Sequence, residues 1–244
     1  MKIIQVKDYQ AMSEKACEII VERMQELEKP VLGLATGSTP EGMYECLIKK
    51  NKEGNVSFKN TSTFNLDEYV GIAEEDPNSY HYFMHDKFLD HVDIEEENSH
   101  LPSGLEKDMD KECKEYEQMI RDAGGIDLQV LGIGVNGHIG FNEPGTPFTK
   151  ETHVVELTDS TRKANSRYFA SIDEVPTHAI SMGPETIMQS KEILLLISGE
   201  NKADAVAKLI EGDVSEQVPV SILKNHENVT LIVDEAALSK TKIK

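Results

Sequence analysis

The sequence has no tryptophan, only three cysteines and no excess of positive charge. Its 244 residues carry 25 lysines and arginines against 44 aspartates and glutamates, which gives a formal net charge of −19. Nucleic acids and anionic membrane surfaces repel such a chain, so neither is an expected partner. An anionic ligand must therefore be bound by a local pocket of cations and backbone amides.

Long hydrophobic runs and cysteine motifs are also missing. The longest aliphatic run, Ile193 to Ile197, is far too short to cross a bilayer, and the N-terminal "MKIIQVKDYQ" lacks the apolar core of a signal peptide. Cys17, Cys46 and Cys113 lie far apart, with no CxxC pair, in segments that read as helices. We expect reduced, structural thiols in a cytoplasmic protein.

Short apolar runs alternate with amphipathic stretches along the chain. The runs predict strands at 31–35, 61–66, 128–134, 177–182, 192–198 and 229–233, and the stretches between them predict helices at 13–29, 39–54, 110–125 and 200–213. Such alternation is typical of an α/β fold in which helices cover both faces of a mostly parallel sheet. At this length we expect residues 1–244 to form a single domain, and no internal repeat is visible.

One glycine-rich stretch, "GIGVNGHIGFNEPG" at 132–145, raises the question of a dinucleotide. Its first three glycines have the GxGxxG spacing of a dinucleotide-binding loop, which leads directly into a helix. Here the glycines are followed by "HIGFNEPGTP", whose glycines and prolines forbid a regular helix. We therefore expect no dinucleotide, and interpret the loop as a sharply turned backbone that presents His138, Asn142 and Glu143 to a small ligand. A hydrogen-bonded core histidine is the alternative for His138.

In open α/β sheets, ligands bind beyond the carboxyl ends of the strands. The segment "ATGSTP" follows the strand at 31–35, and Pro40 suits an early helical position. Backbone amides at a helix start bind anions, and here they would be accompanied by Thr36, Gly37, Ser38 and Thr39. A plain tight turn is the alternative, and no Walker A lysine is present.

Two carboxylates, Asp67 and Glu68, follow the strand at 61–66 in "FNLDEY". Alternate residues of a strand face opposite ways, so Asp67 shares a face with Thr63 and Asn65 while Glu68 takes the other. One carboxylate would then point into the strand-end crevice, where partial desolvation suits a base, and the other can be structural. A solvated strand end is the alternative for the pair.

Cations and histidines complete the candidate residues. "DSTRKANSRYF" contains Arg162, Lys163 and Arg167, and Lys202 opens a helix after the strand at 192–198, so either segment could bind a phosphate. Each alone is more typical of a surface charge, but two such segments at separate strand ends of so acidic a chain favour a phosphate site. His81 and His85 are four residues apart in "SYHYFMH", but no partner at a familiar spacing completes a metal site, so a helix face is the preferred interpretation.

Together the motifs "ATGSTP", "FNLDEY", "SYHYFMH", "GIGVNGHIGFNEP", "STRKANSRYF" and "SGENKA" resemble the glucosamine-6-phosphate deaminases, in order and over nearly the whole chain. The resemblance implies a Rossmann-like three-layer α/β sandwich with no nucleotide, other cofactor or metal. It also implies conversion of glucosamine 6-phosphate and water to fructose 6-phosphate and ammonia.

The resemblance assigns roles to matching positions. Asp67 corresponds to the base that moves a proton from C2 to C1, and His138 to the acid/base that opens the sugar ring. Asn136 and Glu143 would support the histidine. The remaining matches would bind the phosphate: Thr36, Gly37, Ser38, Thr39, Arg167 and Lys202.

Two departures from the family and two alternatives remain. Position 136 is Asn where some members carry Asp, so we expect Glu143 to stabilise the imidazolium more. Allosteric members carry basic residues after the "FNEP" segment and a longer C-terminus, whereas this chain has "FTKETHVVEL" and stops at Lys244. The resemblance therefore does not imply activation by N-acetylglucosamine 6-phosphate, and monomer and homo-oligomer both stay open. A 6-phosphogluconolactonase and a non-catalytic sugar-phosphate sensor are the alternative functions.

Overall fold

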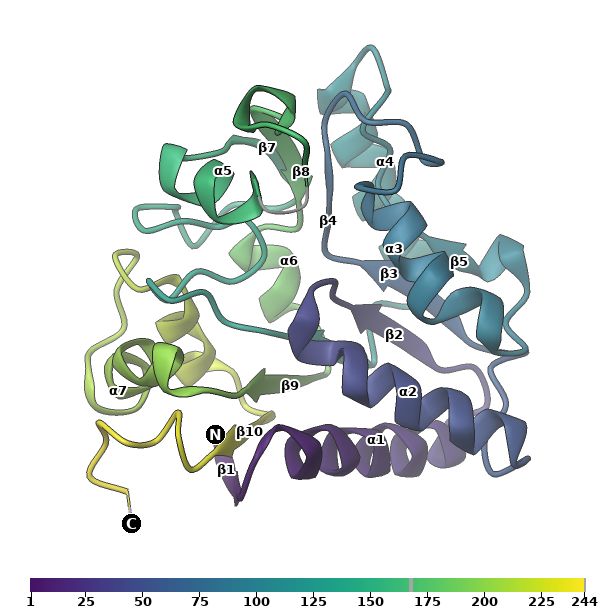
Figure 1. The fold of residues 1–244 in the computed structure, drawn as a ribbon. Coiled ribbons are helices and arrows are strands. Elements are labelled where there is room, and N and C mark those ends of the chain that lie inside the picture. Colours follow the sequence, from purple (N-terminus) through teal and green to yellow (C-terminus); the bar gives the residue numbers. More distant parts are fainter. Residues whose placement is uncertain (167–168, 244) are drawn as a thin grey trace.

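Parallel strands form the central layer of the protein (Figure 1). The computed structural model describes residues 1–166 and 169–243. Within them, a seven-stranded sheet has the order β1-β10-β9-β6-β2-β3-β5, and its neighbouring strands are parallel. Its strands are β1 (Lys2–Val6), β2 (Val31–Leu34), β3 (Ser62–Asn65), β5 (Ser99–His100), β6 (Leu128–Leu131), β9 (Glu192–Ile197) and β10 (Val229–Asp234). The predicted α/β fold with a mostly parallel central sheet is confirmed.

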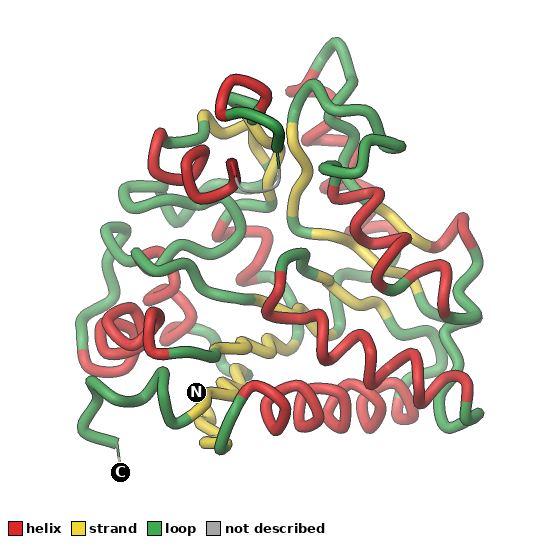
Figure 2. The backbone as a smooth tube through the Cα atoms, in the orientation of Figure 1, coloured by secondary structure: helices red, strands yellow, loops and turns green. Residues whose placement is uncertain are grey.

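Helices cover both faces of this sheet (Figure 2). The helices among the described residues are α1 (Tyr9–Glu26), α2 (Ser38–Lys52), α3 (Tyr80–Lys87), α4 (Met109–Asp122), α5 (Asp159–Asn165), α6 (Pro184–Met188) and α7 (Ala203–Glu211). All but α5 contribute residues to the two apolar clusters on this sheet. In β9, Leu194 and Leu196 pack in the cluster that contains residues of α1 and α2, whereas Leu195 packs with α4, α6 and α7. Because both faces are buried, the strand is a continuous apolar run.

A second, antiparallel sheet lies beside the carboxyl ends of the central strands. It has the order β4-β8-β7, formed by β4 (Asp67–Tyr69), β8 (His178–Ser181) and β7 (His153–Glu156). The predicted strand at 177–182 therefore exists, but its expected place in the parallel sheet is wrong. The sequence "HAIS" does not reveal which partner the strand pairs with.

Leu66 is the residue at which the chain passes from one sheet to the other. Its amide donates to the carbonyl of Leu34 at 3.1 Å, and its own carbonyl accepts from the amide of Met182 at 2.7 Å. The expectation of uninterrupted alternation from Thr63 to Glu68 on one strand is therefore wrong, because β3 ends before Leu66 and β4 begins after it. The transition places Asp67 at the junction of the two sheets.

Several element boundaries also differ from the predictions. The helix expected from residue 13 begins at Tyr9, because the side chain of Asp8 accepts a hydrogen bond from the amide of Ala11 at 3.0 Å and caps it. The strand expected at 128–134 ends at Leu131, and the glycine-rich loop begins there. Among the described residues, no helix is both long and apolar enough to span a membrane.

Candidate active site

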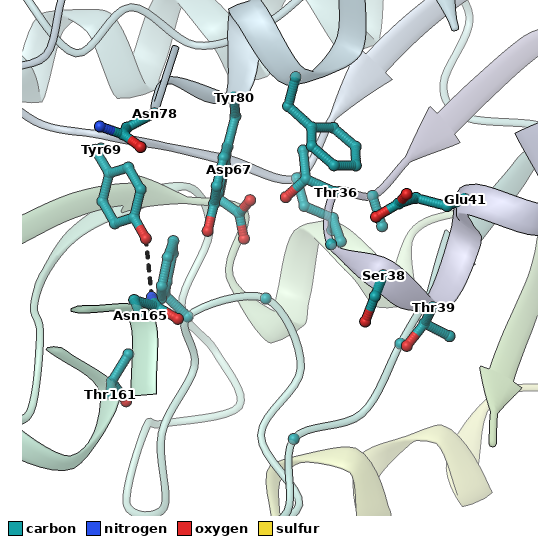
Figure 3. A pocket seen from close by; sticks show the side chains of 18 of the residues that line it. Thr36, Ser38, Thr39, Glu41, Asp67, Tyr69, Asn78, Tyr80, Thr161 and Asn165 are labelled. Carbon is teal, nitrogen blue, oxygen red and sulfur yellow. Dashed lines mark hydrogen bonds between the residues drawn. The ribbon is translucent and has the colours of Figure 1, made fainter. Parts of the chain in front are cut away.

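A cavity of about 620 Å³ opens where β2, β3 and β6 end and β4 begins (Figure 3). It lies beside both sheets, at the position expected for a ligand site in this class of fold. Most of the residues predicted for the site line it: Thr36, Gly37, Ser38, Thr39, Asp67, Asn136, His138 and Lys202. The predicted phosphate ligand Arg167 lies outside the described residues.

The start of α2 forms one end of the cavity. The helix begins at Ser38, and its N-cap residue is Gly37, with φ of +92°. Glycine adopts this backbone conformation readily, and it has no side chain to cap the first amides of the helix. Those amides and the hydroxyls of Ser38 and Thr39 are therefore placed to bind an anion.

Lys202, in the segment before α7, also lines the cavity. Its Nζ donates to the carbonyl of Ile133 at 2.7 Å, which fixes the cation beside the glycine-rich loop. By contrast, Arg162 donates to the carbonyls of Ile172 and Val175 at 3.0 and 3.1 Å and does not line the cavity. The interpretation of Arg162 as a phosphate ligand is therefore wrong, because its guanidinium is used in a contact outside the cavity.

Asp67 lies in the wall of the cavity, between Thr36 on one side and Tyr69 and Asn165 on the other (Figure 3). Only 7% of the residue is exposed. Burial raises the pKa of its carboxyl from 3.8 to about 8, and the neighbouring charge of Glu68 contributes in the same direction. A carboxylate in this environment is a stronger base than one in water.

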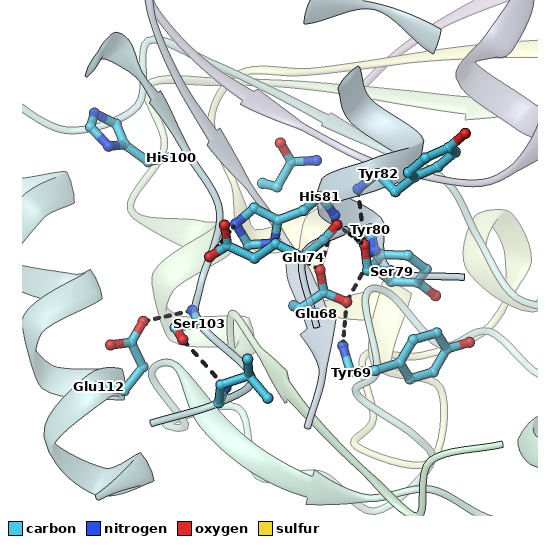
Figure 4. A network of polar contacts seen from close by, with 12 residues as sticks. Glu68, Tyr69, Glu74, Ser79, Tyr80, His81, Tyr82, His100, Ser103 and Glu112 are labelled. Carbon is cyan, nitrogen blue, oxygen red and sulfur yellow. Dashed lines mark hydrogen bonds and ion pairs between the residues drawn. The ribbon is translucent and has the colours of Figure 1, made fainter. Parts of the chain in front are cut away.

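Glu68 holds the start of α3 (Figure 4). Its Oε1 accepts from the amides of Tyr69 and Tyr80 at 2.8 and 3.0 Å. Its Oε2 accepts from the amide of His81 at 2.9 Å and lies 2.9 Å from the Nδ1 of that residue. The two adjacent carboxylates therefore have different surroundings, as expected for one in the crevice and one in a structural role.

The glycine-rich loop holds His138 over Gly134. The amide of Gly134 donates to the carbonyl of His138 at 2.9 Å, and a Cβ on Gly134 would lie only 2.2 Å from Cε1 of the imidazole. The loop continues through turns and isolated bridges, without a helix, so the glycines do not form a dinucleotide site. Burial lowers the pKa of His138; Glu143 raises it and Lys202 lowers it further.

Asn136 and Glu143 are the neighbours of His138 on the same loop. The side chain of Asn136 accepts from the amide of His138 at 3.1 Å and donates to Oε2 of Glu143 at 2.7 Å. Oε1 of Glu143 is 3.7 Å from Nδ1 of His138, which is an ion-pair distance but too long for a hydrogen bond. The expected presentation of Asn142 to a ligand is wrong. Its buried amide donates to the carbonyls of Ile139 and Met182 and braces the loop instead.

Aromatic and polar residues that the sequence arguments did not single out complete the cavity. Tyr69 lies near Tyr80 and Phe141, with ring centroids 4.9 and 5.8 Å away, and its hydroxyl accepts from Asn165 on α5 at 2.9 Å. Thr161, also on α5, donates to Oε1 of Glu143 at 2.5 Å. The motifs "SYHYFMH" and "STRKANSRYF" contain three of these residues, but no spacing rule indicates that they meet Asp67 and Glu143 in space.

His81 and His85 both belong to α3, and their surroundings agree with a helix-face role. His81 contacts Glu68, and Nδ1 of His85 lies 2.7 Å from Oδ1 of Asp90. In the described part of the chain, no group of three or more His, Cys, Asp or Glu side chains is arranged to hold a metal ion.

Residues 7–232 match the protein family described as glucosamine-6-phosphate isomerases/6-phosphogluconolactonase. The chain belongs to this family. A glucosamine-6-phosphate deaminase of Oceanobacillus iheyensis is 59% identical, over 98% of this chain and 95% of the relative. Glucosamine-6-phosphate deaminase 1 of Bacillus subtilis is 50% identical, over 98% of this chain and 99% of its own. The resemblance drawn from the six motifs is confirmed.

Solved structures show the same fold. A monomeric glucosamine-6-phosphate deaminase superposes with a TM-score of 0.96 at 50% identity, covering 98% of this chain and all of that one. A 6-phosphogluconolactonase from Trypanosoma cruzi superposes with a TM-score of 0.80 at 19% identity, over 99% of this chain and 97% of that one. At that identity the lactonase shares the fold alone. Both the backbone and the sequence are therefore closer to the deaminase than to the lactonase.

Proposed function

We propose that this chain is a glucosamine-6-phosphate deaminase that converts glucosamine 6-phosphate and water to fructose 6-phosphate and ammonia in amino-sugar catabolism. One observation carries the proposal: a buried carboxylate with a strongly raised pKa, Asp67, and an imidazole, His138, line one cavity whose end is the N-terminus of α2. The full-length similarity to deaminases supports the same substrate.

The phosphate is proposed to bind at the start of α2. There it would meet the first amides of the helix, the hydroxyls of Ser38 and Thr39, and Lys202. Arg167 is proposed as a further ligand from the resemblance alone. In a protein of net charge −19, such local groups provide the attraction that the overall field does not. Binding energy gained at the phosphate can orient the distant carbons against the catalytic groups.

His138 is proposed to open the sugar ring by moving a proton between O1 and O5. An imidazole whose pKa lies below its usual value is neutral near pH 7, so it can accept the proton from O1 and then donate it to O5. Glu143 and Asn136 are proposed to orient the ring and to stabilise its charged form. The result is the open-chain amino aldehyde.

Asp67 is proposed to take the proton from C2 of this aldehyde and to return a proton to C1. The first transfer gives an enolamine, with O1 taking a proton from the substrate's own ammonium group, and the second gives an iminium group at C2. Addition of water to that iminium group and expulsion of ammonia leave the ketone of fructose 6-phosphate. These steps move only protons and water, so the proposal includes no cofactor and no metal. Glu68 cannot take this role in the observed arrangement, because its oxygens bind the start of α3.

Aromatic residues line the cavity beside Asp67 (Figure 3). Tyr69 and Phe141 are buried, and with Tyr80 they form an apolar wall near Asp67. Such a wall excludes water from the C1 and C2 carbons during proton transfer. We further propose a single cytoplasmic domain, with the oligomeric state open between monomer and homo-oligomer and no nucleic-acid partner.

A side-by-side assay tests the proposal. The purified chain, given glucosamine 6-phosphate alone, should release ammonia and fructose 6-phosphate in equal amounts. Given 6-phosphogluconolactone, it should not exceed the uncatalysed rate, because lactone hydrolysis has no use for the Asp67 proton transfer. Lactone hydrolysis without ammonia would establish the lactonase instead. Tight binding of the sugar phosphate with neither product would indicate a sensor.

A further inference from the structure

Thr161, on α5, and His138, on the glycine-rich loop, approach the same carboxylate oxygen of Glu143. Oε1 of Glu143 accepts a hydrogen bond from Oγ1 of Thr161 at 2.5 Å, while Nδ1 of His138 stays 3.7 Å away. That nitrogen is buried and has no hydrogen-bond partner among the described residues. A buried ring nitrogen without a partner is rare in folded proteins and calls for a physical reason.

The second oxygen of the Glu143 carboxylate, Oε2, is also held in place, and this keeps Oε1 away from His138. Oε2 of Glu143 is held by the side-chain amide of Asn136 at 2.7 Å, and Asn136 is itself fixed by the amide of His138. With one oxygen fixed, the position of the other depends on its own donor. A carboxylate oxygen can accept two hydrogen bonds, so Oε1 could in principle accept from both residues. Its position prevents this, because it lies close to Thr161 and too far from Nδ1 of His138.

Thr161 belongs to a helix that contacts the cavity at two points. Thr161 and Asn165 are one turn apart on α5, and both line the cavity (Figure 3). Asn165 donates to the hydroxyl of Tyr69 at 2.9 Å, in the aromatic wall, while Thr161 donates to Glu143. Both contacts use neutral donors, but only the one from Thr161 reaches a group that acts on the imidazole.

We propose that Thr161 is a positioning residue that controls the imidazole of His138 by competing with it for Oε1 of Glu143. The inference rests on the proposed function only for the role of His138 in ring opening. With the hydroxyl in place, the carboxylate stays beyond hydrogen-bond distance, and the neutral imidazole is favoured. Without it, Oε1 needs to approach by less than about 1 Å to bind Nδ1 at a normal distance, and the charged imidazole becomes favoured.

The charged groups around the imidazole set the direction of the change. Glu143 lies on the same loop and raises the pKa of His138, whereas Lys202, from the segment before α7, lowers it, as does burial. Asp67 of β4 lines the same cavity. Removal of the Thr161 hydroxyl alters only the Glu143 contribution, so the pKa of His138 should rise.

Titration of the histidine ring signals by NMR tests this directly and needs no substrate. In Thr161→Val, which keeps the shape of the side chain, the titration midpoint of His138 should move up by about one pH unit. Thr161→Ser keeps the hydroxyl and should titrate like the parent. Asn165→Ala removes the other α5 contact and should also leave His138 unchanged. His100, on the edge strand β5, serves as an internal standard in every variant.

An unchanged midpoint in Thr161→Val would overturn the proposal. So would an equal rise in Asn165→Ala, because the effect would then come from the helix as a whole rather than from the shared oxygen. The same shift should vanish when Thr161→Val is combined with Glu143→Gln, and its persistence there would also contradict the proposal. If the shift appears but no ammonia is formed by the parent protein, the proposed function fails while the competition stands.

Discussion

Gly134 lies directly against the imidazole of His138, so closely that a single methyl group at that position would overlap the ring. The two residues are also joined by a backbone hydrogen bond of 2.9 Å. Gly132, two residues earlier, has room for a methyl group, since a Cβ there would lie 3.9 Å from the nearest atom, Cβ of Thr39. In the glycine pattern that suggests a nucleotide, Gly134 thus leaves the space that the imidazole of His138 occupies.

This difference gives a prediction with its own control. Gly134→Ala should displace the imidazole by about 1 Å or more and lower kcat roughly 100-fold, because small misplacements of catalytic groups are that costly. Gly132→Ala should keep kcat within about twofold of the parent. Steady-state kinetics of both variants, with circular dichroism to confirm folding, decides the matter. Equal activity of the two variants would show that the position of His138 does not limit the reaction.

The raised pKa of Asp67 predicts a pH dependence. If the ionised carboxylate is the base, kcat/KM should rise with pH as the free enzyme passes through about pH 8. A pH profile measured with the parent protein, in which kcat/KM is already constant from pH 6 upward, would contradict the assignment.

Ionisation of Asp67 should also affect folding stability, which should fall with rising pH whereas kcat/KM rises. The pKa of Asp67 is raised from 3.8 to about 8 on folding, so the folded state binds this proton more tightly than the unfolded state. The resulting stabilisation is complete below the unfolded pKa and is lost as the pH rises through about 8. Asp67→Asn removes the buried charge, so it should be more stable than the parent at pH 9. Urea unfolding at pH 6 and pH 9 measures this; a constant difference between the two proteins would count against the burial of an ionisable carboxyl.

Lys202 should affect binding more than turnover. Lys202→Met is expected to raise KM for glucosamine 6-phosphate roughly 10- to 100-fold, the value of one charge-assisted hydrogen bond, with a smaller change in kcat. Lys163→Met, an exposed lysine on α5 outside the cavity, is the matched control and should leave KM unchanged. Inhibition by inorganic phosphate provides a second readout, and equal inhibition of all three proteins would remove Lys202 from the phosphate site.

Glu68 should matter for stability. Glu68→Ala leaves the amides of Tyr80 and His81 without their acceptor, so we expect a loss of about 3 kcal/mol or more in the free energy of unfolding. Glu74 contacts His81 from the surface at 3.5 Å, with 59% of its side chain exposed, so Glu74→Ala should cost less than about 0.5 kcal/mol. Urea denaturation compares the two, and similar small losses would mean that α3 does not depend on Glu68.

Much of the architecture follows from the sequence because buried parallel strands are apolar runs of recognisable length. The run at 192–198 and the run at 229–233 became β9 and β10 with small changes at their ends. The antiparallel sheet was missed as a unit because β4 and β7 are three and four residues long and show no clear period. Its existence depends on the pairing of β8 with β7 and β4, which both precede it in the chain, the nearer by more than 20 residues.

Some residues of the candidate site can be predicted from the sequence, and others cannot. Asp67, His138 and the start of α2 are predictable from the sequence because each follows a strand, and strand ends of a parallel sheet meet at one edge. The different surroundings of Asp67 and Glu68 were also predicted, although the two residues lie on β4 rather than on a continuation of β3. Thr161 and Asn165 were not singled out, because only the folded chain brings α5 against Glu143 and Tyr69.

The most direct test of the central claim compares ammonia release by Asp67→Asn and by the parent protein, with glucosamine 6-phosphate as the sole substrate. The substitution keeps the size of the side chain and removes only its ability to take a proton. We predict steady release of ammonia by the parent and a turnover at least about 1000-fold lower in the variant. The variant should still bind inorganic phosphate. Wild-type turnover by Asp67→Asn would contradict the account.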